Sequence, residues 1–249
     1  MLRLEKLEKH FGGNHVTRSV TTSFEKGSLT SIIGPNGAGK TTLFNLISGR
    51  TAPDSGRVIL AGEDISGLSE VQVVRRGIAR AFQVASLFPS FTVRKSIEAA
   101  VVSARRGFTR FKPIFPERAD AIKAAEILAL IGLQSVADTP SAILSHGDRK
   151  LLDIGIALAL EPKVLLLDEP TAGMGPDERW EMVDRVQALW KASGLTLIFI
   201  EHDIDIIFKI SQRVRVLSYG ALLAEGTPDE IRQDPKVIEA YLGSEVDHA

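Results

Sequence analysis

Hydrophobic and polar positions alternate with two different periods along this chain, one typical of strands and the other of helices. Two apolar runs, at 164–167 and 195–200, have the length of strands, and nearly all of their positions are hydrophobic. Such runs are typical of central strands in a parallel sheet that is covered on both faces. A further buried strand is expected at 29–33, followed by a helix with one apolar face at 40–48. The pattern therefore predicts an α/β fold with a mostly parallel sheet.

Weaker patterns predict the remaining elements. The opening stretch to about residue 25 alternates as strands do, and short strands are expected at 57–60, 214–218 and 221–225. The region 88–161 has a mostly helical pattern, with helices at 117–131 and from about 147 to 160, and helical turns follow at 228–242. No repeat, low-complexity tract or interdomain linker interrupts the chain, so we expect one domain over 1–249.

Composition narrows the class of protein. The 249 residues are 44% hydrophobic and 24% charged, as in ordinary soluble globular proteins. Thirty basic and 31 acidic residues leave a formal charge of −1, so a nucleic-acid partner is not expected. The lack of cysteine excludes disulfide frameworks, thiolate catalysis and cysteine-ligated metals. No run approaches the roughly 18–20 apolar residues of a membrane span, and charges in the first six residues argue against a signal peptide.

A glycine-rich loop links the strand at 29–33 to the helix at 40–48. It reads Gly34-Pro35-Asn36-Gly37-Ala38-Gly39-Lys40-Thr41, with Thr42 next, and fills the pattern G-x-x-x-x-G-K-[ST]. Glycines let backbone N–H groups surround phosphate oxygens, and the helix N-terminus adds partial positive charge. Lys40 supplies a full positive charge, and the Thr41 hydroxyl can reach Mg²⁺. A strand-to-helix turn without a ligand is the alternative, but this context favours a phosphate site.

Polar residues follow three other predicted strands. Asp168 and Glu169 end the run at 164–167, Gln83 follows a strand at 78–82, and His202 follows the run that ends at 200. Because the carboxyl ends of parallel strands border the ligand crevice, these side chains are expected at one edge. There Asp168 could hold Mg²⁺ through water, and Glu169 could polarise the water that attacks a γ-phosphate. Taken singly, each residue could instead be structural, and the acidic pair could be a helix N-cap.

The segment Leu144-Ser145-His146-Gly147-Asp148 precedes the helix expected from about 147, with Ser145 in the N-cap position. Helix capping alone would account for this segment. However, the order of the phosphate loop, Gln83, this segment, Asp168-Glu169 and His202 resembles the ATP-binding cassette (ABC) ATPases, and the resemblance extends from end to end.

The resemblance implies a role for each motif. The loop from Gly34 to Thr42 would be the Walker A loop that binds ATP, and Asp168 would be the Walker B aspartate. Glu169 would be the catalytic carboxylate, Gln83 would join Mg²⁺ to the helical subdomain, and His202 would lie near the γ-phosphate. Phe11 matches the aromatic residue that stacks on adenine. Ser145, His146, Gly147 and Asp148 would form the signature, in which Ser145 and Gly147 bind the nucleotide of an opposite subunit.

The resemblance also implies an architecture and two ligands, ATP and Mg²⁺. A P-loop NTPase core with an N-terminal antiparallel β subdomain would cover 1–87 and 162–249. An α-helical subdomain carrying the signature would cover 88–161. Because the signature completes the site of another subunit, two cassettes would close head-to-tail around two ATP molecules.

Within the family, the chain looks most like the ATPase subunits of branched-chain amino-acid importers. This likeness rests on Phe11-Gly12-Gly13, the segments 34–46 and 168–174, and the tail at 224–228 and 237–243. It implies two transmembrane permease subunits, an external solute-binding protein, and a peripheral location on the cytoplasmic face of the inner or plasma membrane. Relatives for urea, amides and other small solutes leave the substrate open. The alternatives are a non-transport cassette and a slowly hydrolysing partner cassette.

Two positions depart from the family pattern. Asp148 stands where the signature usually has glutamine, and Gly175 stands where the D-loop usually has aspartate or asparagine. These departures suggest that the second ATPase subunit is a different chain.

The segment 104–113 is basic with interleaved aromatic residues. It could contact lipid headgroups or permease loops, or it could be a solvated loop.

Overall fold

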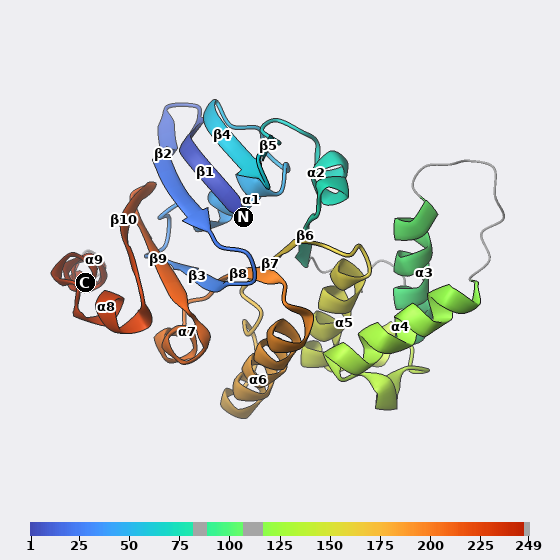
Figure 1. Cartoon of the computed structure of the whole chain (residues 1–249). Helices are drawn as coiled ribbons and strands as arrows, with labels where there is room; N and C mark the ends of the chain where they lie inside the picture. The colour runs from blue at the N-terminus through green and yellow to red at the C-terminus, as the bar shows by residue number, and fades with distance from the viewer. Residues whose placement is uncertain (82–88, 107–116, 247–249) are drawn as a thin grey trace.

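A six-stranded, mostly parallel sheet forms the centre of the computed structural model, which describes residues 1–81, 89–106 and 117–246 (Figure 1). Its strands, in spatial order, are β10 (Ala221–Gly226), β9 (Arg213–Ser218), β3 (Leu29–Ile33), β8 (Thr196–Ile200), β7 (Val164–Asp168) and β6 (Ile78–Ala81). All pairs are parallel except β9 with β10. The predicted α/β class and the three buried strands are confirmed.

The two faces of this sheet enter two different hydrophobic cores. Along β7, Leu165 and Leu167 contribute to one core, while Val164 and Leu166 contribute to the other. Strand β8 divides its residues in the same alternating way. Burial on both faces explains why these strands appear in the sequence as uninterrupted apolar runs.

An antiparallel sheet covers one of these cores. It consists of β2 (Asn14–Phe24), β1 (Leu2–Phe11), β4 (Ser55–Leu60) and β5 (Glu63–Asp64), in that order. A register shift between Leu4 and Leu7 of β1, with Lys6 at φ +46°, keeps both leucines fully buried although their spacing is odd. Helix α1 (Lys40–Ile47) packs into the same core through Phe44. The expected N-terminal antiparallel sheet is therefore present.

Helices cover the other face and the flanks. The helices and short 3₁₀ turns are α2 (Glu70–Arg76), α3 (Val93–Arg106), α4 (Arg118–Ile131), η2 (Gln134–Val136), η3 (Ser141–Ile143), α5 (His146–Leu158), α6 (Pro176–Ser193), α7 (Ile204–Ile210), α8 (Pro228–Gln233) and α9 (Pro235–Val246). Helices α3, α4 and α5 form one group, at the right in Figure 1. This group confirms the helical pattern of the middle region. In the described ranges, no helix combines the length and the apolar character needed to cross a membrane.

Helix ends follow their capping residues. Helix α4 begins after Glu117, whose backbone N–H donates to the Asp120 carboxylate, and it ends at Gly132 with φ +74°. The sequence pattern did not predict α6, which starts with Pro176 and ends before Gly194. It also did not predict α7, which is only seven residues long and begins after Asp203. Along the chain, α6 separates β7 from β8, and α7 separates β8 from β9.

Candidate nucleotide-binding and catalytic site

The glycine-rich loop is held tightly against two neighbouring strands. Gly34 has φ +151°, and a Cβ atom there would lie 2.1 Å from the carbonyl oxygen of Leu217 in β9. Gly39 has φ +94°, and a Cβ atom there would lie 2.7 Å from the carbonyl oxygen of Val16 in β2. Gly39 is also the N-cap residue of α1 and has no side chain to accept a hydrogen bond. The first backbone N–H groups of α1 therefore have no side-chain acceptor at the N-cap. The loop is thus a rigid turn that presents a helix N-terminus.

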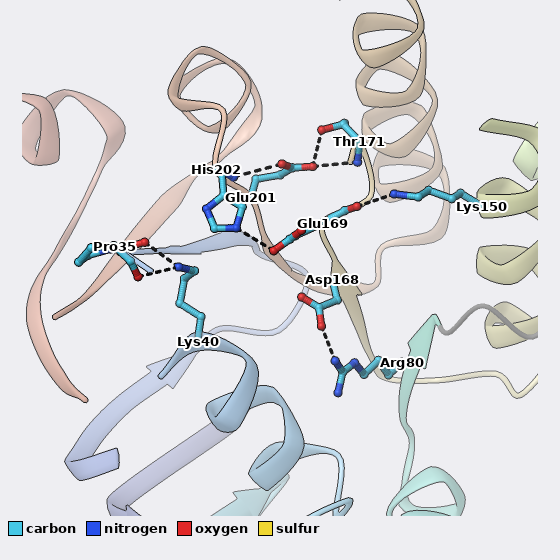
Figure 2. Close-up of polar contacts among 10 residues, drawn as sticks. Pro35, Lys40, Arg80, Lys150, Asp168, Glu169, Thr171, Glu201 and His202 are labelled. Carbon is cyan, nitrogen blue, oxygen red and sulfur yellow. Dashed lines mark hydrogen bonds and ion pairs between the residues drawn. The ribbon is translucent and has the colours of Figure 1, made fainter. Parts of the chain in front are cut away.

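Lys40 lies buried inside this loop. Its Nζ donates to the carbonyl oxygens of Gly34 at 2.6 Å and Pro35 at 3.0 Å (Figure 2). Burial lowers the pKa of Lys40, while the charges of Glu169 and Asp168 act in the opposite direction. The loop therefore holds an ammonium group in front of the two carboxylates at the end of β7.

These two carboxylates point in different directions (Figure 2). Asp168 is ion-paired with Arg80 of β6. Glu169 has a left-handed backbone with φ +48°, and its Oε1 accepts a hydrogen bond from His202 Nε2 at 2.7 Å. Because an ionised carboxylate can only accept, the imidazole is the donor. The structure brings Lys40, Asp168, Glu169 and His202 together, as the sequence predicts.

Two charged side chains that were not predicted from the sequence bind the loop after β7. Lys150 of α5 donates from Nζ to the carbonyl oxygens of Glu169 at 2.7 Å and Ala172 at 3.0 Å. Buried Glu201 accepts through Oε1 from the Thr171 backbone N–H at 2.9 Å and hydroxyl at 2.6 Å. A charged residue directly after a fully apolar strand is a signal that could have indicated Glu201. Lys150 has no comparable signal, because its role depends on where α5 packs.

Burial lowers the pKa of Lys150, whereas the carboxylates around it, with Glu201 the largest contributor, raise it. This ammonium group is thus held between backbone carbonyl oxygens and acidic side chains. Arg80, described above, was likewise not singled out in the sequence.

The signature segment begins α5. Ser145 Oγ accepts from the Asp148 backbone N–H at 3.1 Å, so the predicted N-cap is confirmed. His146 Nε2 donates to the Ala172 carbonyl oxygen at 3.1 Å, while Gly147 and Asp148 are half-buried in the first turn. Gly175 is exposed at the start of α6, with open space where a Cβ atom would be. The signature of this chain therefore contacts the loop that follows its own Glu169.

Two other predicted site residues, Phe11 and Gln83, are not part of this group of contacts. Phe11 ends β1 as a half-exposed ring, with Lys9 Nζ 5.6 Å from its centroid. Gln83 lies outside the described residues, as do positions 107–113 of the basic segment. Their proposed contacts stay predictions.

A cavity of about 350 Å³ opens beside the two carboxylates. It is lined by Thr41, Arg80, Ala81, Lys150, Asp153, Ile154, Leu167, Asp168, Glu169, Pro170 and Ala172. A hydroxyl and carboxylate oxygens are ligands that suit Mg²⁺. No cluster of three or more His, Cys, Asp or Glu side chains in the described residues could enclose a metal by itself. The residues thus fit a metal ion that takes its remaining ligands from phosphate oxygens and water.

A family model described as "ABC transporter" matches residues 17–172, which include the glycine-rich loop, the signature and both carboxylates. The chain belongs to the ABC transporter family. It is an ATP-binding subunit of this family, and such subunits are ATPases that power transport. A second model, "Branched-chain amino acid ATP-binding cassette transporter", matches residues 221–247.

Curated relatives extend over the whole chain. The chain is 35% identical over 251 residues to the high-affinity branched-chain amino acid transport ATP-binding protein LivG of Escherichia coli (strain K12), covering 98% of both chains. It is 36% identical over 252 residues to BraF of Pseudomonas aeruginosa, a protein of the same description, again covering 98% of each. The comparisons give no support to the non-transport alternative.

Solved structures agree with the fold. The ADP conformation of MJ1267, an ATP-binding cassette of an ABC transporter, superposes with a TM-score of 0.86 at 34% identity over 98% of both chains. A nucleotide-free cassette from an ABC transporter gives a TM-score of 0.84 at 34% identity, covering 97% of this chain and 98% of that one.

Proposed function

We propose that this ATPase hydrolyses MgATP to power the import of branched-chain amino acids or a similar small organic solute. The ATPase chemistry is supported above all by the position of buried Lys40 in the glycine-rich loop beside Asp168 and Glu169. The substrate class is supported by the printed names of the relatives and by the family model that matches the C-terminal segment.

Each residue would have a separate task. Lys40 and the loop amides would bind the phosphates, and Thr41, Asp168 and Gln83 would hold Mg²⁺. Mg²⁺ would neutralise phosphate charge. Glu169 would take a proton from the attacking water, while His202 orients the Glu169 carboxylate through the 2.7 Å hydrogen bond. Phe11 would stack on adenine, and the signature would act on the ATP of the opposite subunit.

Contacts with permeases would hold the chain at the cytoplasmic face of the membrane. These contacts would come from the helical region at 88–112, and a groove of about 710 Å³ beside residues 103 and 104 supports this placement. It lies between α2, α3 and α5 and includes Val71, Arg75, Ser103 and Ala104. Expressed without permeases, the chain should be mostly recovered outside the membrane fraction. Recovery in carbonate-washed membranes under those conditions would contradict this attachment.

The second cassette would be a different chain. Asp148 in the first turn of α5 would bring negative charge toward the nucleotide of the partner, and Gly175 provides no side chain at the D-loop. A heterodimer would carry this unfavourable charge at one site rather than two. Full transport by a complex assembled with this cassette alone, unchanged by a sibling cassette, would contradict the heterodimer.

The proposed function can be tested by purifying the native complex through a tag on the full chain and identifying its membrane partners by mass spectrometry. Reconstituted in vesicles with ATP on the cassette side and binding protein on the other, it should take up labelled leucine. A matched complex with Lys40→Ala should bind nucleotide weakly and take up none. Retrieval of no permease, or ATPase activity that no amino acid or small amide stimulates, would contradict the proposal.

A further inference from the structure

Arg80 of β6 is a buried cation held by contacts with two other elements of the site, β7 and α1. Only 6% of its side chain is exposed. One terminal guanidinium nitrogen pairs with Asp168 Oδ2 at the end of β7, and the other donates to Asn45 Oδ1 of α1 at 2.7 Å. The guanidinium carbon also lies 5.7 Å from the ring centre of Phe44. Since the guanidinium is planar and rigid, these contacts fix its orientation.

This cation faces the carboxylate proposed to hold Mg²⁺. An arginine stays protonated in a protein interior, so Asp168 has a permanent counter-ion when no metal is bound. A metal ion that approaches Asp168 must weaken this ion pair or share the carboxylate with it. The positive charge of Arg80 also repels a divalent cation placed nearby. Both effects lower the affinity of this carboxylate for Mg²⁺ alone.

We propose that Arg80 is a positioning residue that sets the Mg²⁺ requirement of the site. It holds Asp168 in place without metal and prevents Mg²⁺ from binding ahead of the nucleotide. The phosphates of a bound nucleotide would supply the additional negative charge and ligands that favour Mg²⁺ over the guanidinium at Asp168. This inference rests on the proposed MgATPase function.

The position of Arg80 in the fold supports this role. Asn45, its second partner, lies one helical turn after Thr41 on α1. Arg80 itself lies on β6, the strand that leads toward Gln83. Arg80 therefore connects α1, which carries Thr41, with the end of β7 at Asp168, and its own strand leads toward Gln83.

The first experiment measures how Mg²⁺ supports nucleotide binding. The full chain is titrated with Mg²⁺ at a fixed concentration of fluorescent N-methylanthraniloyl-ADP, which removes hydrolysis from the readout. Neutral Arg80→Gln and Arg80→Met should lower the half-saturating Mg²⁺ concentration by roughly five-fold or more, because a nearby positive charge is lost. Arg80→Lys keeps the charge and should stay within about two-fold of the wild type.

A control is Arg94→Gln, since Arg94 is half-exposed and pairs with Asp138 at 3.0 Å in another part of the chain. It should leave the Mg²⁺ titration unchanged. An unchanged or higher half-saturating concentration in both neutral Arg80 variants would overturn the inference. If the wild type binds no nucleotide at all, the proposed function fails, and the inference fails with it.

A second experiment needs no nucleotide and remains informative if a variant is less stable. Thermal unfolding is followed with and without millimolar Mg²⁺. Ligands that bind only the folded state raise Tm, so Mg²⁺ alone should raise the Tm of Arg80→Gln and Arg80→Met but leave the wild type and Arg94→Gln unchanged. Equal shifts in wild type and variants would overturn the inference.

Discussion

Asp168 and Glu169 are neighbours in the sequence, but their surroundings in the fold differ sharply. Asp168 faces β6 and α1, where its partner is a guanidinium that is 6% exposed. Glu169 turns through a left-handed backbone toward β8, where its partner is a histidine that is 47% exposed. A buried arginine provides a fixed charge, whereas an accessible imidazole can exchange protons. These different partners support the proposal that Asp168 serves metal binding and Glu169 serves proton transfer.

The largest expected effect comes from removing the base on the Glu169 side. Glu169→Gln should reduce ATP turnover by roughly 10²–10⁴-fold, because a positioned general base contributes about that much. Nucleotide affinity should be retained, since Lys40 and the loop remain, and an ATP-bound dimer should accumulate. Phosphate release and equilibrium binding measure the two effects separately. Near-normal phosphate release would rule out Glu169 as the base.

Substitution of Lys150 tests whether the rate of ATP hydrolysis depends on the backbone position of Glu169. Lys150→Met removes the donor to two backbone carbonyl oxygens and should lower kcat about ten-fold with little change in KM, because small displacements of a catalytic group are costly. Lys150→Arg, which can still donate, should recover most of the activity. Lys191→Met, at an exposed position near the end of α6, is the matched control. A proportional rise in KM would indicate that Lys150 serves binding instead.

Substitution of Glu201 tests how much its hydrogen bonds to the loop after β7 contribute to the stability of the protein. Glu201→Gln exchanges one acceptor oxygen for an amide donor among three hydrogen bonds from Thr171 and His202. The free energy of unfolding in urea should fall by about 1–3 kcal/mol, the usual cost of a buried polar mismatch. Thr171→Val, which retains the backbone hydrogen bond to Glu201, should cost less. A Glu201→Gln protein as stable as the wild type would show that this network does not hold the loop.

The smallest expected effect lies away from both carboxylates, at Asp54. Hydrogen bonds from Lys9 Nζ and the His10 backbone N–H lower the pKa of Asp54 to about 2. Because the folded pKa lies below the ordinary value of 3.8, the stabilisation is present above pH 4 and is lost as pH falls toward 2. Asp54→Asn should slightly lower Tm at pH 7, with the difference shrinking below pH 4. A Tm difference that is independent of pH would contradict this origin.

The sequence predicted the motif positions well because strand ends and glycine loops have local signals. The apolar runs located β7 and β8, and the polar residues after them were correctly placed at one edge. Contacts between distant segments could not be predicted in this way. The pairing of Arg80 with Asp168 depends on β6 lying next to β7, and that of Lys150 with Glu169 depends on the packing of α5. Helix α6 was missed because its apolar face is weak and its ends are set by Pro176 and Gly194.

The division of roles between the two carboxylates is tested most directly by the Mg²⁺ dependence of nucleotide binding in two isosteric variants. Asp168→Asn should raise the Mg²⁺ concentration needed for half-maximal binding of fluorescent ADP, because it removes the charge proposed to hold the metal. Glu169→Gln should leave that concentration unchanged, because its carboxylate faces His202 instead. Equal shifts in the two variants, or a shift in Glu169→Gln alone, would contradict the assignment.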